Sequence, residues 1–173
     1  MDIQATSFPP IVGFAPRILI LGTMPGMESL KQQRYYAHPR NAFWPIMTAY
    51  CERDSSLVYA ERCEMLKQAR IALWDVLKSC RRPGSLDQHI EPDSMIANDL
   101  VTFLQDHTSI ERIFFNGGKA EQLFKRHISN RLNKAGVSVT CVKLPSTSPA
   151  HAAMPYEKKQ QIWHQALSIP PMG

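Results

Sequence analysis

Short apolar runs bounded by turn residues recur along the chain and predict buried strands. Several of them end at glycine, asparagine or proline, which favour turns. Runs of this kind suit the strands of a sheet that is covered on both faces. The predicted strands span residues 17–22, 71–76, 110–115 and 137–144.

Segments with apolar positions at helical spacing fall between these strands. In residues 42–51, for example, Phe43, Ile46 and Tyr50 follow a helical period. Pro155 stands at the expected first position of the last helix. Strands that alternate with helices predict an α/β fold, in which a parallel sheet has helices on both faces and ligands bind beyond the carboxyl ends of the strands. The predicted helices span residues 42–51, 57–69, 95–105, 119–132 and 156–167.

The composition limits the class of protein without deciding it. We expect the 173 residues to form one domain, 1–173, since no repeat or long linker is present. A net charge of +5 favours polyanionic partners. No apolar stretch reaches about 18 residues and no basic segment opens the chain, so we expect no membrane span and no signal peptide. These features predict a monomer in the cytoplasm.

The four cysteines, Cys51, Cys63, Cys80 and Cys141, lie far apart in the sequence. A zinc or iron–sulfur site would usually show a closely spaced pair, and none of these cysteines forms a C-x-x-C motif. We therefore expect reduced cysteines and a protein that needs neither a metal nor a cofactor.

The loops after the predicted strands carry the residues best suited to contact a ligand. The first strand leads into residues 22–26, Gly-Thr-Met-Pro-Gly, whose glycines let the backbone approach a ligand closely. This segment is neither G-x-G-x-x-G nor a P-loop, which counts against a dinucleotide or a nucleoside triphosphate. Residues 35–44 then crowd four aromatic rings around His38, Arg40 and Asn41. A helix N-cap would explain Asn41 but not the residues before it.

Together these segments resemble the motifs of the uracil-DNA glycosylase superfamily. The resemblance rests on residues 22–26, on residues 37–44 (Ala-His-Pro-Arg-Asn-Ala-Phe-Trp) and on residues 145–150 (Pro-Ser-Thr-Ser-Pro-Ala), and it spans most of the chain. Within the superfamily, the chain is most similar to the hypoxanthine-DNA glycosylase branch, also called deoxyinosine glycosylase. This resemblance implies a three-layer α/β/α sandwich around a short central parallel sheet. It also implies that the partner is DNA containing a deaminated base.

Two positions depart from the members that excise uracil. Mismatch-type members carry an asparagine in the first motif, where this chain has Met24, and the classical enzymes open the second motif with a histidine, where this chain has Leu144. Both departures argue against ordinary uracil excision. In the hypoxanthine branch the important polar residue lies in the His-Pro-Arg-Asn segment, so the resemblance assigns catalysis to Asn41.

The chemistry of glycosidic cleavage is consistent with an asparagine in this role. The reaction passes through an oxocarbenium-like sugar, so the attacking water needs placement more than deprotonation. The side-chain carbonyl of Asn41 could orient that water. Backbone N–H groups near Thr23 and Met24, and at the start of the following helix, could stabilise the departing base. No lysine lies within the three motifs, so we expect monofunctional hydrolysis that leaves an abasic site.

The other candidates for the base pocket follow from the same motifs. We expect Tyr36 to stack on the flipped base, unless it only packs against its own loop. His38 would contact the sugar or a phosphate, or be held by local hydrogen bonds. Asn116 would read the base edge, accepting from hypoxanthine N1–H and donating to O6, or be a simple turn residue. A freely flipping amide would also pair with adenine, and the sequence does not show what fixes it. The floor of the pocket is expected to be Gly22, Thr23, Met24, Pro25 and Gly26.

A second group of candidates is expected to hold the DNA. The short polar loop that follows the last strand suits phosphate contacts on either side of a kinked strand. His151 would enter the gap left by the flipped base or lie on the surface. We expect Arg81 and Arg82 to lie in a solvated surface loop. Lys125, Arg126, His127 and Arg131 should form an ordinary basic helix face. The predicted DNA-binding residues of this loop are Ser146, Thr147, Ser148 and Pro149, of which the two serines and the threonine are the phosphate donors.

Three other functions fit parts of this pattern. The nearest keeps the fold and excises uracil or mismatched thymine, against which Met24 and Leu144 weigh. An α/β enzyme that acts on a small nucleotide or another phosphate is disfavoured because no phosphate-binding glycine motif is present. A DNA-damage binder without catalysis would bind tightly and release no base.

Overall fold

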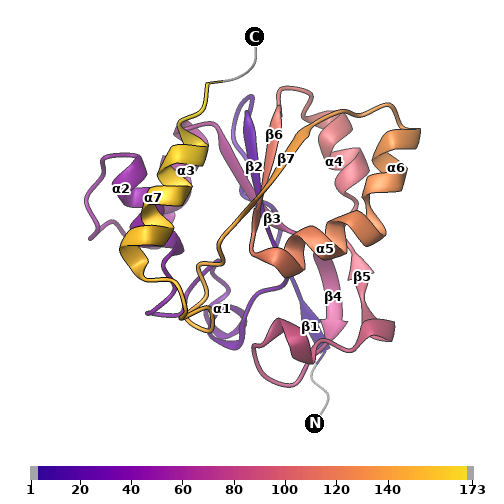
Figure 1. Ribbon diagram of the computed structural model, residues 1–173, viewed down its shortest axis with the longest axis horizontal. Helices are drawn as coiled ribbons and strands as arrows, with labels where there is room; N and C mark the ends of the chain where they lie inside the picture. Colours follow the sequence, from indigo (N-terminus) through magenta and orange to yellow (C-terminus); the bar gives the residue numbers. More distant parts are fainter. Residues whose placement is uncertain (1–3, 171–173) are drawn as a thin grey trace.

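The computed structural model describes residues 4–170 and is built around a four-stranded parallel sheet (Figure 1). The strand β2 (Ile18–Gly22) lies in the centre, is fully buried, and pairs with a strand on each side. The sheet order is β3-β2-β6-β7. All four predicted strands are present, with bounds that shift by at most three residues. Their observed bounds are Ile71–Asp75 for β3, Arg112–Asn116 for β6 and Thr140–Leu144 for β7.

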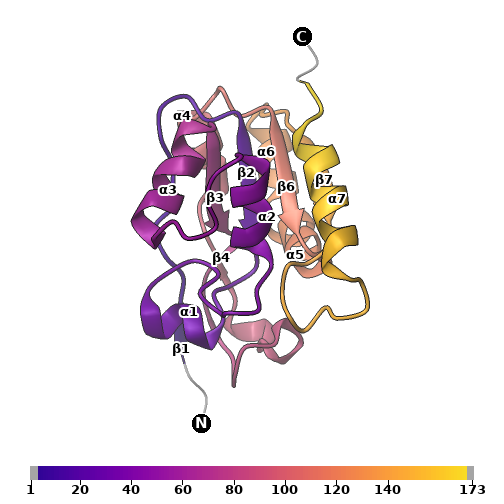
Figure 2. The same cartoon turned by 90° about the vertical axis from the view of Figure 1, so that its left-hand side faces the viewer.

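Helices cover both faces of this sheet, as Figures 1 and 2 show. Successive residues of β2 point to opposite faces. Leu19 and Leu21 therefore join one hydrophobic core, and Ile18 and Ile20 join the other. This arrangement confirms the predicted three-layer α/β/α sandwich. One face packs against α2 (Phe43–Tyr50), α3 (Tyr59–Gln68) and α7 (Tyr156–Leu167), and the other against α4 (Leu100–Asp106), α5 (Gly118–His127) and α6 (Ser129–Lys134).

A second, antiparallel sheet lies beside the carboxyl ends of the parallel strands, and the sequence did not predict it. It has the order β1-β4-β5, with β1 at Gln4–Thr6, β4 at Leu77–Arg81 and β5 at Ile96–Ala97. Its strands are short and mixed in polarity, so none forms a continuous apolar run. The middle strand β4 follows β3 after a single residue, Val76.

Two predicted helices have different bounds for local reasons. The helix predicted at 95–105 begins only at Leu100, because the side chain of Asp99 accepts a hydrogen bond from Thr102 N at 3.1 Å and caps it there. The helix predicted at 119–132 is interrupted at Ile128, whose φ of −120° departs from helical values, and forms α5 and α6 instead.

Two further elements correct the sequence prediction near the site. The helix α1 (Met27–Gln32) follows the Gly22–Gly26 segment directly and was not predicted. Pro155 is the N-cap of α7 and not its first helical residue. Two short 3₁₀ turns, Asp87–His89 and Pro92–Ser94, connect β4 to β5.

Candidate active site

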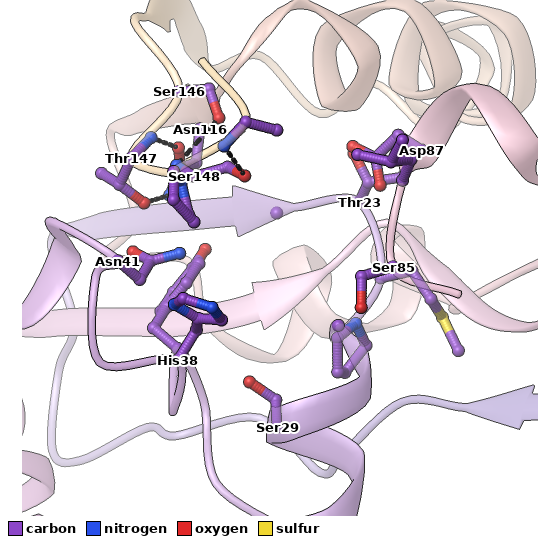
Figure 3. Close-up of a pocket in the computed structure, with 18 of the residues that line it drawn as sticks. Thr23, Ser29, His38, Asn41, Ser85, Asp87, Asn116, Ser146, Thr147 and Ser148 are labelled. Atoms are coloured by element: carbon purple, nitrogen blue, oxygen red, sulfur yellow. Dashed lines mark hydrogen bonds between the residues drawn. The ribbon is translucent and has the colours of Figure 1, made fainter. Parts of the chain in front are cut away.

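One cavity of about 580 Å³ opens at the carboxyl ends of the parallel strands, where ligands bind in such folds. Figure 3 shows Asn41, His38 and Asn116 on one side of it, with Thr23, Asp87 and Ser85 on the other. All the residues predicted for the site line this cavity. They are Gly22, Thr23, Met24, Pro25, Gly26, Tyr36, His38, Asn41, Asn116, Ser146, Thr147, Ser148, Pro149 and His151.

Thr147 joins three of the predicted segments at this cavity. Its backbone N–H donates to Asn116 Oδ1, and its Oγ1 accepts from Asn116 Nδ2, both at 2.9 Å. Its carbonyl oxygen accepts from Ala42 N at 3.0 Å, which ties the loop to the start of α2. Thr147 is only 1% exposed. In the structure the N–H and Oγ1 of Thr147 thus position Asn116, and the expected phosphate contact from Thr147 stays a prediction.

These two bonds fix the orientation of the Asn116 side chain (Figure 3). Rotating the amide would place its NH₂ group against the N–H of Thr147, so only one orientation satisfies both bonds. An amide oxygen has two lone pairs and an amide nitrogen two hydrogens. After the two bonds to Thr147, one lone pair of Oδ1 and one hydrogen of Nδ2 remain unbonded. Asn116 can thus still accept one hydrogen bond and donate another to a ligand.

Asn41 lies just before Ala42, the N-cap residue of α2, and its side chain bonds to the first N–H group of the helix. Its Oδ1 accepts from Phe43 N at 3.0 Å, so the amide orientation is again set by a backbone donor. The second lone pair of Oδ1 and the Nδ2 group remain for a ligand or a water molecule. The first N–H groups of the helix are already bonded, Ala42 N to Thr147 and Phe43 N to Asn41. These two N–H groups are therefore not free for a departing base, and stabilisation of the base by the start of this helix stays a prediction.

The two neighbouring candidates, His38 and Tyr36, are also held locally. His38 Nδ1 accepts from Arg40 N at 3.0 Å, which leaves Nε2 as the ring nitrogen free for the cavity. The Tyr36 ring stacks on Phe43 with a centroid distance of 4.2 Å, so one of its faces is already covered. Tyr36 has a positive φ of 53°, and its hydroxyl lies near the Asn116 amide without a well-directed hydrogen bond. Base stacking by Tyr36 stays a prediction for the other face.

Arg82 is buried, contrary to the expectation that it lies in a solvated surface loop. Arg82 is only 2% exposed, and its guanidinium donates to Pro25 O at 2.5 Å and to Gly84 O at 2.8 Å. The same guanidinium lies 4.0 Å from Asp87 Oδ1. Arg82 therefore stabilises the Gly22–Gly26 segment through its hydrogen bond to the Pro25 carbonyl group. Its neighbour Arg81 does lie on the surface, where it pairs with Glu91 at 2.7 Å.

Two carboxyl groups of the cavity were missed by the sequence analysis. Asp75 ends β3 beside Gly22, is 4% exposed, and has an Oδ2 atom without a hydrogen-bond partner. Burial, with a contribution from the Asp87 charge, raises the pKa of Asp75 to about 7. Burial likewise raises the pKa of Asp87, although the Thr23 hydroxyl and Arg82 oppose the shift. The signal for Asp75 was present, because an ionisable residue interrupts an apolar run.

The loop after β7 forms the rim of the cavity. Ser146 Oγ accepts from Ser148 N, and Ser148 Oγ accepts from Ala150 N, each at 3.2 Å. Both hydroxyl hydrogens stay available for a phosphate. His151 is exposed, and its carbonyl accepts from the buried Lys159 at 2.7 Å, which anchors the end of the loop.

Other expectations concern metals, cysteines and membranes. Within residues 4–170, no three acidic, histidine or cysteine side chains are grouped so that they could hold a metal ion. The four cysteines are free. None of the helices in this part of the chain is long and apolar enough to cross a membrane. The predicted single basic helix face is divided between two helices, since Lys125, Arg126 and the half-buried His127 lie on α5 whereas the exposed Arg131 lies on α6.

Comparison with known proteins identifies the class to which this fold and site belong. Residues 9–167 match the family model of the Uracil DNA glycosylase superfamily, and the chain therefore belongs to that superfamily. A protein of Methanosarcina barkeri, named Hypoxanthine DNA glycosylase, is 36% identical over 120 residues, which are 68% of this chain and 74% of that protein. A protein of the same name from Methanosarcina acetivorans is 37% identical over 114 residues, or 65% and 71% of the two chains.

A solved structure supports the same assignment. The solution NMR structure of a candidate uracil DNA glycosylase from Methanosarcina acetivorans superposes with a TM-score of 0.79 at 29% sequence identity. The match covers 95% of this chain and 97% of that one. The fold implied by the sequence motifs is thus confirmed over nearly the full length of both proteins.

Proposed function

We propose that this protein is a DNA glycosylase that flips a deaminated base, hypoxanthine by preference, into the cavity and hydrolyses its bond to the sugar. The observation that carries the proposal is the fixed amide of Asn116, which lines the cavity on the same side as Asn41 (Figure 3). Membership of the uracil DNA glycosylase superfamily and the names of the relatives support it. The predicted domain, residues 1–173, acts in this proposal as a monomer on DNA.

The orientation of Asn116 explains which bases the cavity accepts. With one acceptor and one donor position left, the amide pairs with a base edge that presents an N–H beside a carbonyl oxygen. Hypoxanthine and uracil present this pattern, whereas adenine and cytosine present the reverse. Thr147 therefore supplies what the sequence could not show, a lock that prevents Asn116 from flipping to accept adenine.

Asn41 is the proposed catalytic residue. Its free lone pair and Nδ2 can hold a water molecule at the cavity while Phe43 N keeps the amide in one orientation. An amide is too weak a base to remove a proton early, but an oxocarbenium-like transition state needs only a well-placed water. A positioning role of this kind can be worth a hundredfold or more in rate, about 3 kcal/mol on the barrier.

The contacts with DNA are proposed from the rim of the cavity. The hydroxyl groups of Ser146 and Ser148 are free to donate to phosphates beside the flipped nucleotide. Pro149 keeps this loop rigid, and the exposed His151 stands where a side chain could fill the gap in the duplex. The proposal needs no metal and no covalent intermediate.

The test uses duplex oligonucleotides that contain inosine, uracil or xanthine, with alkali cleavage to reveal abasic sites. We expect inosine to be cut fastest and an unmodified duplex to stay intact. Borohydride should trap no covalent adduct. A protein that binds inosine DNA tightly but releases no base would overturn the proposal, and faster release of uracil would shift it to the second candidate function. That candidate remains because uracil offers Asn116 the same base edge.

Variants of Asn41 separate catalysis from helix capping. Asn41→Ala should lose about 1 kcal/mol of stability, the usual value of a cap, and at least a hundredfold in single-turnover rate. Asn41→Asp retains an acceptor for Phe43 N and should keep part of the activity. The matched control is Asn130→Ala at an exposed position of α6, which should change neither rate nor stability. A near wild-type rate for Asn41→Ala would end the catalytic assignment.

A further inference from the structure

The floor of the cavity holds a carboxyl group that the reaction described above does not use. Asp75 is 4% exposed and makes no ion pair among residues 4–170, since Arg82 pairs with Asp87 instead. Its Oδ2 is buried without a hydrogen-bond partner. A buried carboxyl group in this state costs folding free energy. A purely structural position would be better filled by an amide or an apolar side chain.

The surroundings of Asp75 direct its carboxyl group toward the cavity. Gly22 pairs with Asp75 across β2 and β3. A Cβ atom on Gly22 would lie only 2.5 Å from Asp75 Oδ1 and 2.9 Å from Tyr36 Oη. Gly22 therefore leaves open the space through which these two groups reach the cavity. The Tyr36 hydroxyl is also buried without a partner, so two polar groups converge here with unmet hydrogen bonds.

We propose that Asp75 is a further catalytic residue, whose protonated carboxyl group delivers its proton to a ring nitrogen of the purine as the base leaves. This inference rests on the proposed function, because it requires a purine in the cavity. A neutral purine carries ring acceptors at N3 and N7, whereas neutral uracil has no ring nitrogen that can accept a proton. The role therefore favours hypoxanthine over uracil at the step of bond breaking.

The proposed step balances without any further reactant. The C1′–N9 bond breaks, and its electron pair leaves with the purine. The proton of Asp75 moves to the purine and neutralises that charge. The oxygen of the water held at Asn41 forms the new bond to C1′, and the surplus proton of this water is released to solvent. Asp75 is reprotonated from solvent when the product has left.

The environment keeps about half of the Asp75 carboxyl groups protonated at pH 7, because the pKa is raised to about 7. Burial is the main reason that the pKa of Asp75 is raised, and the negative charge of Asp87 adds to it, while Arg82 acts in the opposite direction. Tyr36 and Tyr35 are the other titratable groups close to this carboxyl group, and burial raises both of their pKa values, so they stay neutral. A general acid with a pKa near the working pH can contribute a hundredfold or more in rate.

The test measures single-turnover release of hypoxanthine from inosine DNA between pH 5.5 and 9. For the wild type we expect a rate that falls as the pH rises through about 7. Asp75→Asn should bind inosine DNA normally, cleave it at least a hundredfold more slowly, and lose this pH dependence. The matched control is Asp87→Asn in the same cavity. It should retain the falling limb but shift it to lower pH, because the like charge has been removed.

Modified substrates test the same step without any change to the protein. In 3-deaza- and 7-deaza-2′-deoxyinosine one ring acceptor is replaced by carbon. The wild type should cleave more slowly the analogue that lacks the nitrogen protonated by Asp75. On that same analogue, Asp75→Asn should be no slower than it is on inosine DNA. Three results would overturn the inference. They are a cleavage rate of Asp75→Asn within threefold of the wild type, a pH profile of this variant that matches the wild type, and an equal further loss of rate by this variant on both analogues. Release of no base at all by the wild type would instead refute the proposed function.

Discussion

Replacing Asp75 with asparagine should also change how the stability of the protein depends on pH. Asparagine has nearly the same shape as aspartate, so the change removes an ionisable group and little else. In the unfolded chain this carboxyl group has its ordinary pKa of 3.8, and in the folded protein the pKa rises to about 7. The folded state therefore binds more protons than the unfolded state between these two values.

The size and sign of the effect follow from linkage. A raised carboxyl pKa gives a contribution that is fully present below pH 3.8 and is lost as the pH rises through about 7. The difference between 3.8 and 7 is about 3 units, and each unit corresponds to about 1.4 kcal/mol. The wild type should thus lose up to about 4 kcal/mol of unfolding free energy from this one group. Asp75→Asn should not lose it.

The assay compares urea unfolding of the two proteins at intervals between pH 4 and pH 8.5. The difference between them isolates Asp75, because every other titratable group is present in both. The stability of the variant relative to the wild type should rise across this range and level off above about pH 7.5. A difference that stays flat from pH 5 to pH 8.5 would refute the argument, since it would mean that Asp75 titrates alike in the folded and unfolded states.

Three other results are expected. Arg82→Met should cost about 3 kcal/mol in chemical denaturation, because a buried carbonyl group at Pro25 and a partly buried one at Gly84 lose their charged donor. Arg81→Met removes an exposed ion pair and should cost under about 1 kcal/mol. Affinity for duplex DNA, followed by fluorescence anisotropy, should fall linearly on a log–log plot against salt, and a flat response would exclude phosphate contacts. Base release should persist in excess EDTA; loss of activity that zinc restores would contradict this expectation.

The sequence predicted the parallel sheet and the motif residues because both depend on local patterns. A strand such as Ile18–Gly22 is an unbroken apolar run, and the three motifs are contiguous stretches that end strands or begin helices. Carboxyl ends of parallel strands meet at one edge, so residues from separate motifs line one cavity. The second sheet was missed because its short strands, Leu77–Arg81 for instance, have no such pattern.

What the sequence could not show depends on contacts between distant residues. Arg82 was expected in solvent because it stands in an Arg-Arg-Pro-Gly-Ser turn, yet its partner Pro25 lies 57 positions earlier. Thr147 was expected on DNA because hydroxyl groups commonly bind phosphates, yet its own partner Asn116 lies 31 positions away. Each of these side chains has chemistry suited to either environment. Only the tertiary structure decides which surface it meets.

In the proposed mechanism, the arrangement around Gly22 and Asn116 couples recognition of the base to cleavage of its bond to the sugar. Thr147 holds Asn116 in a single orientation. In the proposal, this orientation accepts a base edge that presents an N–H beside a carbonyl oxygen. Gly22 leaves room for the carboxyl group of Asp75, which in the proposed mechanism contacts the departing base. A base that Asn116 rejects would stop short of the acid that helps it leave. Selectivity would then be expressed in the rate of cleavage more than in the affinity for damaged DNA.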